Sequence, residues 1–422
     1  MTDQRSSTDP AGRLRRLKRR FWQPPRAHGD VIEDRTVSFL ELFYDLVYGV
    51  DIAQASHTLA EHISWLGFAE FAVIFGLIWI AWLNGTLYYD LHGREEGRTR
   101  VFVFIQMMLL ALLAVFTADA ASEGGTPFAI VYTLFLVVLA WLWYSVRRQD
   151  TEEYMVLTKR YLLGMVAMTI AMALSAFLPD EPRMVLWAIV VIGYIGAAIL
   201  TGRSAEGVRM GTAATDSMVE RFGLFIIIVL GEVVVGVVSG LSDTERNFES
   251  VATGLIGLMI GFAFWWTYFD FVGRRLPAAR QTAFIQWLVS HLPVALSITA
   301  TGAAMISLIE HAADDRAPAP TAWLLAGAVA VGLVSLVVTM HSLADYRRVQ
   351  RVYQPVSYAL FAAAAAALLV GWARPAPWLL ALLLVAILSA VWMFAVDRWL
   401  RLDNPDDILP NAGVTATPDG SG

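Results

Sequence analysis

Long apolar stretches follow one another along almost the whole chain, and no other feature of the sequence constrains the fold as much. Each is about 20 residues long, which is the length an α-helix needs to cross the hydrocarbon core of a bilayer. A backbone inside a bilayer must satisfy its own polar groups, so such stretches favour membrane-spanning helices. We therefore expect an all-α integral membrane protein with about twelve spans: 38–60, 66–89, 101–121, 127–146, 158–178, 183–201, 217–240, 250–271, 282–308, 321–342, 353–373 and 376–398.

Composition agrees with this class and excludes several kinds of chemistry. Only 16% of the 422 residues are charged, against about a quarter in an ordinary soluble domain. The chain has no cysteine, which excludes disulfides, thiolate metal ligands and cysteine nucleophiles. The sequence contains no G-x-S-x-G, H-E-x-x-H or Walker A motif, and no cytoplasmic region large enough to hold a nucleotide. We expect neither an enzyme nor a cofactor.

The positive charges predict how the chain lies in the membrane. If the N-terminus is cytoplasmic, 26 Lys and Arg residues fall on the cytoplasmic side and four on the other, with Arg221 inside a span. Short loops that are rich in Lys and Arg stay in the cytoplasm, so we expect both termini there. The basic tail 1–36 and the C-terminal tail 401–422 are expected to be disordered. The basic N-terminal tail is expected to contact anionic lipid headgroups rather than nucleic acid.

The chain also repeats itself. YDLHGREEGRTRVFVFIQ at 89–106 aligns without a gap on FDFVGRRLPAARQTAFIQ at 269–286. This predicts two parallel six-helix repeats, 37–201 and 217–400, joined by a cytoplasmic linker at 202–216. The shared loop motif carries Asp90 and Arg94 in the first copy and Asp270 and Arg274 in the second. Each pair has the i, i+4 spacing of a simple ion pair at a helix end.

The first expected span is unusually acidic. FLELFYDLVYGVDIAQASHTLAEH, at 39–62, carries Glu41, Asp45 and Asp51. At 100° per residue these side chains and Tyr48 share one face roughly 120° wide. A charged side chain at the bilayer centre costs about 2.5–3.5 kcal/mol even on lenient scales. This face must therefore point toward protein or a water-filled cavity.

The seventh span mirrors the first, with Glu220 and Arg221 at its start and Glu232 about 18 Å further along the helix, near the midplane. Glu41, Glu220 and Arg221 have two readings: a structural ion-pair cluster or a cytoplasmic gate. Glu232 has no cation in its own helix, and a carboxyl group in dry surroundings could bind and release protons near neutral pH. Asp51 is similarly deep, and both structural and functional readings stay open for it.

His291 precedes Pro293 by two residues in the ninth span. The proline frees a backbone carbonyl, which is typical of a substrate site or a hinge. The alternative is a structural histidine that bonds a neighbouring carbonyl. No pair among Glu232, Asp51 and His291 has a diagnostic metal-ligand spacing, so we expect no metal site.

Three segments resemble one known family. FLELFYDLV at 39–47, with Gln54 and His57 after it, resembles the opening motif of the low-temperature-requirement A (LtrA) family of bacterial membrane proteins. ERFGLFIIIVLGE at 220–232 and SHLP at 290–293 are similar to later parts of that family. The resemblance implies a multi-spanning protein of the bacterial inner membrane. By motif position it carries over these residues: Glu41, Asp45, Gln54, His57, Glu220, Arg221 and Glu232. Asp51 stands where the resemblance implies a small apolar residue.

Two hypotheses on function follow. The first is a secondary transporter of a small solute or ion, in a proton-coupled form with Glu232 as the titrating group and Asp45 and Asp51 along the path. His291 is a further candidate. The alternative is a non-transporting membrane sensor or regulator linked to growth in the cold, which needs no aqueous path. The sequence indicates neither the substrate nor an oligomeric state.

Overall fold

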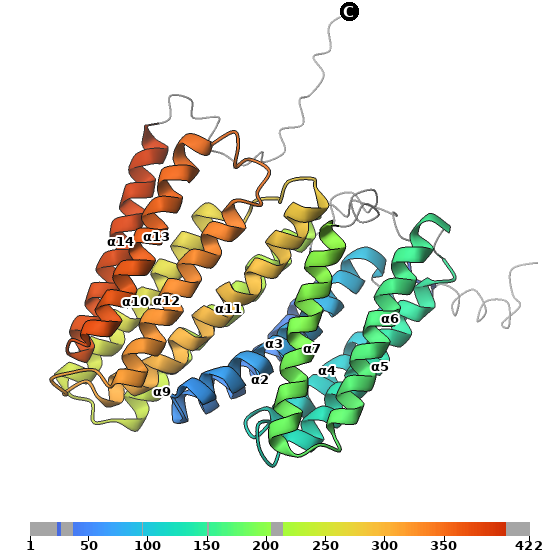
Figure 1. Cartoon of the computed structure of the whole chain (residues 1–422), viewed down its shortest axis with the longest axis horizontal. Helices are drawn as coiled ribbons and strands as arrows, with labels where there is room; N and C mark the ends of the chain where they lie inside the picture. The colour runs from blue at the N-terminus through green and yellow to red at the C-terminus, as the bar shows by residue number, and fades with distance from the viewer. Residues whose placement is uncertain (1–22, 27–36, 95, 150–151, 204–213, 402–422) are drawn as a thin grey trace, which may run out of the picture. The chain divides into compact units, whose positions relative to one another are not determined.

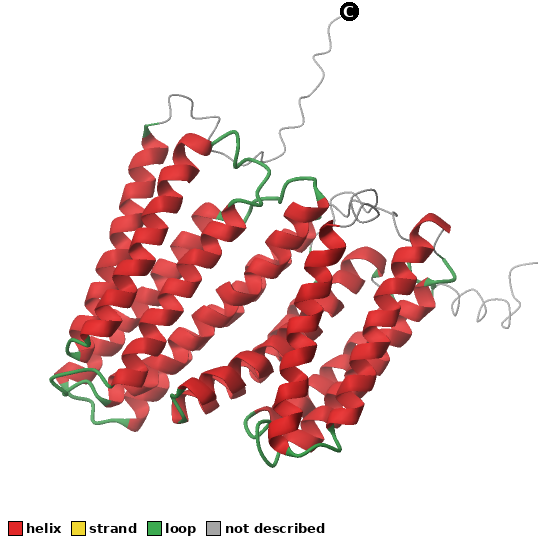
Figure 2. Ribbon diagram, viewed as in Figure 1, coloured by secondary structure: helices red, strands yellow, loops and turns green. Residues whose placement is uncertain are grey.

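The computed structural model describes residues 23–26, 37–94, 96–149, 152–203 and 214–401. Within these residues the regular structure is helical, apart from an isolated bridge between Pro277 and Leu343 (Figure 2). Most of the expected N-terminal tail, the middle of the linker 202–216 and nearly all of the C-terminal tail lie outside the described residues.

The described residues form twelve long helices (Figure 1). Their bounds are α2 Phe39–Glu61, α3 Trp65–His92, α4 Gly97–Thr117, α5 Gly125–Val146, α6 Glu152–Ser175, α7 Asp180–Arg203, α9 Asp216–Asp243, α10 Phe248–Phe271, α11 Gln281–Glu310, α12 Ala319–Met340, α13 Gln350–Ala373 and α14 Pro377–Leu400. Each coincides with one expected span to within four residues at either end, except that α6 begins six residues earlier than expected.

Ten of these helices are long and apolar enough to cross a membrane. The two others are α2 and α6. In α2 the buried acids Asp45 and Asp51 lower the mean hydropathy of the helix, and α6 begins with two glutamates and carries Lys159 and Arg160. That these two helices also cross the membrane stays a prediction.

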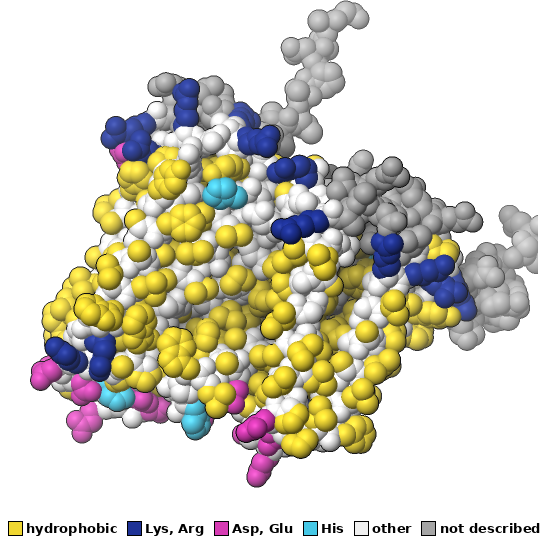
Figure 3. Space-filling view, viewed as in Figure 1, with side chains coloured by type: hydrophobic (Ala, Val, Ile, Leu, Met, Phe, Trp, Pro, Cys, Tyr) yellow, Lys and Arg dark blue, Asp and Glu magenta, His cyan; other side chains and the backbone are white. Residues whose placement is uncertain are grey.

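The outer surface has the distribution that a bilayer requires. In the space-filling view, apolar side chains cover the flanks of the helices, while charged side chains gather near the helix ends (Figure 3). Among the exposed apolar side chains are Ile189 and Leu200 of α7, which are 60% and 70% exposed. Exposed apolar flanks of this extent match a hydrocarbon environment rather than water.

The chain divides into two compact units. Unit 1 comprises Met1–Met210 and Thr215–Val229, and its helix α3 packs against α2, α5 and α7. Further pairs in this unit are α2 with α4, α4 with α5, α5 with α6 and α6 with α7. The first turns of α9 belong to unit 1 because Phe222 and Phe225 pack on Trp82 of α3.

Unit 2 comprises Gly211–Ala214 and Leu230–Gly422. Its most buried helix is α11, which packs against α12 and α10, while α13 packs on α12 and α14, and α14 on α10. The second part of α9 lies against α11. At their crossing Gly236 faces Gly302, and a Cβ added to Gly236 would lie 2.1 Å from the Gly302 carbonyl oxygen. The division between the units falls inside α9, whereas the expected repeats, defined by sequence similarity, stay a prediction.

Candidate functional site

The candidate site in unit 1 is built on α2, whose start is fixed by local hydrogen bonds. Ser38 accepts from the backbone N–H of Glu41, and the Glu41 carboxylate accepts from the N–H of Ser38. This capping box satisfies two N–H groups that a helix start otherwise leaves unpaired. It sets the register of α2, and Asp45 and Asp51 are then both fully buried. The acidic face that the sequence predicts therefore points into the protein.

Asp45 forms a buried ion pair with Arg221 of α9. The Arg221 Nη2 atom lies 2.7 Å from Asp45 Oδ1, and Arg221 Nε lies 2.9 Å from Asp45 Oδ2. Trp82 of α3 donates its indole N–H to Asp45 Oδ1 at 2.9 Å. Both carboxylate oxygens are thus hydrogen-bonded by groups from two other helices. Bidentate pairs of this kind fix orientation as well as charge.

Aromatic rings exclude water from this pair. Trp82 stacks on Phe225 with 4.0 Å between ring centroids, and Phe222 meets its edge at 4.8 Å. The Arg221 guanidinium carbon lies 5.7 Å from the ring centroid of Tyr44. Arg221 is 3% exposed and Asp45 0%. The pair consequently acts in a medium of low dielectric constant, where its attraction is strong and the loss of one partner is costly.

Of the expected cluster of Glu41, Glu220 and Arg221, the arginine forms an ion pair with Asp45. Glu41 is 8% exposed and caps α2, and its charge also acts on Asp45 and Arg221. Glu220 accepts from the backbone N–H of Val37 at 3.4 Å. The two glutamates therefore hold the segment that leads into α2, one turn before the ion pair.

A pair of tyrosine hydroxyls continues the polar row along α2. The hydroxyls of Tyr44 and Tyr48 lie 3.0 Å apart, and both residues are fully buried. Gly85 of α3 leaves room for the Tyr44 hydroxyl, because a Cβ at that position would lie 2.6 Å from it. Nearby, Tyr89 donates to Gln106 of α4 at 2.5 Å. Buried hydroxyls in such a row form linked hydrogen bonds that strengthen one another. A proton can move along such a chain of hydrogen bonds.

Asp51 lies one turn beyond Tyr48 and has an unusual environment. The Thr117 hydroxyl of α4 lies 3.5 Å from Asp51 Oδ1, at the limit of a hydrogen bond, and itself bonds the Leu113 carbonyl at 3.0 Å. Among the described residues, no group donates to Asp51 Oδ2, which is fully shielded from solvent. An ionised carboxylate in this position lacks the partners that burial demands.

The loop motif after α3 holds two other parts of unit 1. The Asp90 carboxylate accepts from Ser217 at 2.7 Å and from Thr215 at 2.9 Å, at the start of α9. Arg26 donates to the carbonyls of Asp90 and Gly93 at 2.5 and 2.8 Å. Arg94 is half-buried. The motif thus fastens the residue 23–26 segment and the start of α9 to the end of α3.

The second copy of the loop motif is arranged differently. Asp270 accepts from the indole N–H of Trp392 at 2.9 Å, and its backbone carbonyl accepts from Arg275. Arg274 is exposed. Arg275 also pairs with Asp345 in the loop after α12, next to the Pro277–Leu343 bridge. Asp270 therefore links the end of α10 to α14 within unit 2.

Two family-motif residues, Gln54 and His57, lie away from the buried row of α2. His57 is exposed and lies 3.5 Å from Glu61. Gln54 is half-buried, and its backbone carbonyl accepts from Thr58. Neither side chain joins the site that Asp45 and Asp51 define.

Unit 2 holds the other deep candidates, Glu232 and His291. Glu232 is 7% exposed, and none of the described residues donates a hydrogen bond to its carboxylate. Its backbone carbonyl lies against Gly302, where a Cβ would approach it to 2.5 Å. His291 has a partner at each ring nitrogen: Nδ1 bonds the Trp287 carbonyl at 2.6 Å and Nε2 the Tyr268 hydroxyl at 3.1 Å. The bond to the Trp287 carbonyl is the one expected of a structural histidine.

Sequence reasoning missed several members of the site. Tyr44 follows the same 3.6-residue period as the acids on α2, so the pattern could have revealed it. Trp82, Gln106 and Thr117 are polar groups in apolar helices, and nothing in their spacing names their partners. No cluster of three or more His, Asp or Glu side chains that could hold a metal ion occurs in the described part of the chain.

Comparisons with known proteins place the chain in a family. The family model described as "Bacterial low temperature requirement A protein (LtrA)" matches residues 36–392. The chain is 28% identical over 280 residues to a protein of Rhizobium meliloti (strain 1021) described as "Uncharacterized protein RA0937". That match spans 61% of this chain and 66% of the relative, just under two thirds. No solved structure matches the chain. The chain, with its motifs at Glu41–Asp45 and Glu220–Glu232, belongs to the bacterial low temperature requirement A family.

Proposed function

We propose that this protein is a secondary transporter of a small solute or ion in the bacterial inner membrane. One observation carries the proposal: a row of buried polar groups, from the Asp45–Arg221 pair through Tyr44 and Tyr48 to Asp51, runs inside unit 1. Acidic groups within membrane helices are costly and mark ion or substrate paths by default. An inert helix bundle has no need of such a row.

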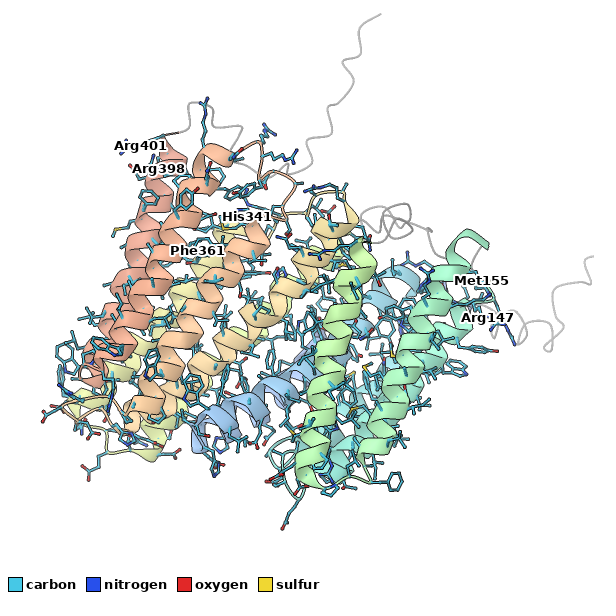
Figure 4. All side chains as sticks on the ribbon, viewed as in Figure 1. Arg147, Met155, His341, Phe361, Arg398 and Arg401 are labelled. Carbon is cyan, nitrogen blue, oxygen red and sulfur yellow. The ribbon has the colours of Figure 1, made fainter. Side chains whose placement is uncertain are left out.

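Within this proposal all twelve helices cross the membrane as two parallel repeats. The helix neighbours support the repeats: α3 packs on α7 as α10 packs on α14, and α4 and α6 pack on α5 as α11 and α13 pack on α12. Both termini lie in the cytoplasm. Arg147 at the end of α5, and Arg398 and Arg401 at the end of α14, stand at ends that would face the cytoplasm (Figure 4). The partners are the lipid bilayer and the transported solute, without nucleic acid and without catalysis.

We assign distinct roles to the parts of the row. The Asp45–Arg221 pair locks α9 to α2 at the cytoplasmic end, and Glu41 and Glu220 hold the entry to α2. Asp51 is the ion-binding carboxylate. Glu232 is a further deep carboxylate in unit 2, and its convergence with Asp51 stays a prediction.

A thiol-labelling experiment tests for an aqueous path, because the chain has no cysteine of its own. Single cysteines replace Asp51 and the buried Ala55 one turn further along α2. Membrane vesicles are then treated with a membrane-impermeant maleimide, with and without a proton gradient. Leu46→Cys serves as the matched control on the same helix, because Leu46 is 57% exposed on the flank that would face lipid.

Transport predicts labelling of positions 51 and 55, at a rate that changes with the gradient for position 55, where Asp51 is intact, while position 46 stays unlabelled. Absence of labelling at 51 and 55 under every condition would refute a water-accessible path. The chain would then be better described as a sensor or regulator. One observation favours that alternative: Tyr44, Tyr48 and Asp51 are all 0% exposed, as in a dry core.

A further inference from the structure

We propose that the coupling ion is a proton, that Asp51 binds it, and that the hydroxyls of Tyr48 and Tyr44 connect Asp51 with the cytoplasmic Asp45–Arg221 pair. This rests on the proposed transport function and names its ion and its route. Two features of unit 1 carry it: the unpartnered Asp51 Oδ2 and the paired hydroxyls one turn away.

The surroundings of Asp51 fit a proton better than a metal ion. Ca²⁺ or Mg²⁺ needs about six oxygen ligands, and Zn²⁺ needs about four ligands. In the described residues, the side-chain hydrogen bond to this carboxylate comes from the Thr117 hydroxyl at 3.5 Å. That hydroxyl already donates to the Leu113 carbonyl. A proton needs no cage, because it bonds covalently to one carboxylate oxygen and removes the charge that burial penalises.

No ion pair joins Asp51 to a Lys or Arg side chain among the residues that the structure describes. On its own helix Tyr48 lies three residues before it and Asp45 six residues before it. From α9, Arg221 is already engaged by Asp45. Tyr132 of α5 acts on Tyr48, and its hydroxyl is bound to a carbonyl of α3 at 2.7 Å. From α3 and α4, Tyr89 and Gln106 bond each other. The neutral acid is therefore the form of Asp51 that this environment accommodates.

The transfer step balances without another reactant. A proton that enters at the cytoplasmic Asp45–Arg221 end is taken up by the Tyr44 oxygen as Tyr44 gives its own proton to Tyr48. Tyr48 gives its proton to the Asp51 carboxylate once side-chain motion brings its hydroxyl to the unpartnered Oδ2 atom, so one O–H bond breaks and one forms at each hydroxyl. Both tyrosines end neutral, and Asp51 gains one proton. The return transfer, toward either side, regenerates the carboxylate.

Infrared difference spectroscopy tests the binding site without a known substrate. The purified protein in lipid is titrated with pH while the carbonyl stretch of protonated carboxylic acids is recorded. We expect a titrating band that Asp51→Asn removes and that Glu61→Gln, a change at the exposed end of α2, leaves in place. Asp51→Glu should keep a titrating band at a shifted frequency. A band unaffected by Asp51→Asn, or one that responds to sodium instead of pH, would overturn the assignment.

The rate at which the same band appears after a rapid change of pH tests the proposed route through the two tyrosines. Tyr48→Phe and Tyr44→Phe should keep the band and slow its appearance by about 10²-fold, the usual contribution of a positioned proton-transfer group. Tyr132→Phe removes another buried hydroxyl of unit 1 and should not slow it. Equal rates in all four proteins would eliminate the tyrosine route. If the band depends on Asp51 while positions 51 and 55 never label, the proton site stands and transport falls. If positions 51 and 55 do label but the band does not depend on Asp51, the transport proposal stands and the proton site is rejected.

Discussion

Removal of the Arg221 side chain by substitution with methionine should strongly destabilise the protein. Methionine keeps much of the length of the side chain but takes away all three hydrogen bonds to the Asp45 carboxylate. Asp45 is then 0% exposed with only the Trp82 indole N–H as a partner. The carboxylate must either remain charged in a dry site or take up a proton, and both cost free energy.

The size of the effect follows from this burial. Removing one partner of a buried ion pair typically costs about 3–5 kcal/mol, because the other charge is left uncompensated. The double variant Asp45→Asn, Arg221→Met removes both charges of the pair and should recover part of that loss. The two single variants and the double variant form a cycle, and their coupling free energy should be large and favourable to the native pair.

Reversible unfolding in mixed detergent and lipid micelles measures the free energies of unfolding for this cycle. Arg401→Met is the matched control, because Arg401 also pairs with an aspartate, Asp397, but the two side chains are 71% and 48% exposed. An exposed pair of this type contributes little or nothing measurable. If Arg221→Met destabilised no more than Arg401→Met, the Asp45–Arg221 pair would not be a buried lock, and its assigned role would be refuted.

Three further predictions concern packing and hydrogen bonds. Gly302→Ala should lower the free energy of unfolding by about 1–3 kcal/mol through overpacking, because its Cβ would lie 2.5 Å from the Glu232 carbonyl. Gly327→Ala, in open space, should be neutral or stabilising in the same thermal-shift assay, and equal losses would contradict the crossing geometry. Tyr132→Phe removes a hydrogen bond to a buried carbonyl of α3 and should cost about 1 kcal/mol in unfolding measurements; no loss would argue against that bond. Arg26→Ala should raise hydrogen exchange at 90–94, and unchanged exchange would show that the segment is not held there.

The sequence was sufficient for the helices and for the buried face of α2. The expected span 282–308 corresponds to α11 at Gln281–Glu310, because apolar length reports helix length directly. Helical periodicity also placed Asp45 and Asp51 on one face, which the structure buries. The ends of the helices were less well predicted. The helix α4 ends at Thr117, whereas the sequence predicted a span that continues to residue 121. Turn hydrogen bonds after Thr117 end the helix there.

Partners across the fold were beyond the sequence. Periodicity tells which side chains share a face, but it does not tell which other helix meets that face. Arg221 was therefore grouped with Glu41 and Glu220, its neighbours in register, although it pairs with Asp45. The same limit hid the Thr117 contact of Asp51. A partner within the same helix could be predicted. His291 bonds the Trp287 carbonyl one helical turn away, as the alternative of a structural histidine predicts.

The distance along the chain between Asp45 and Arg221 also has a consequence for membrane assembly. The two residues are 176 positions apart. At a synthesis rate of about 5–20 residues per second, Arg221 leaves the ribosome about 9–35 s after Asp45. During that interval α2 carries an acid without its cation and is too polar to count among the apolar spans. If α2 crosses the membrane as proposed, its ion pair with Arg221 forms only after α9 has been made, and the pair orders the two insertion events in time.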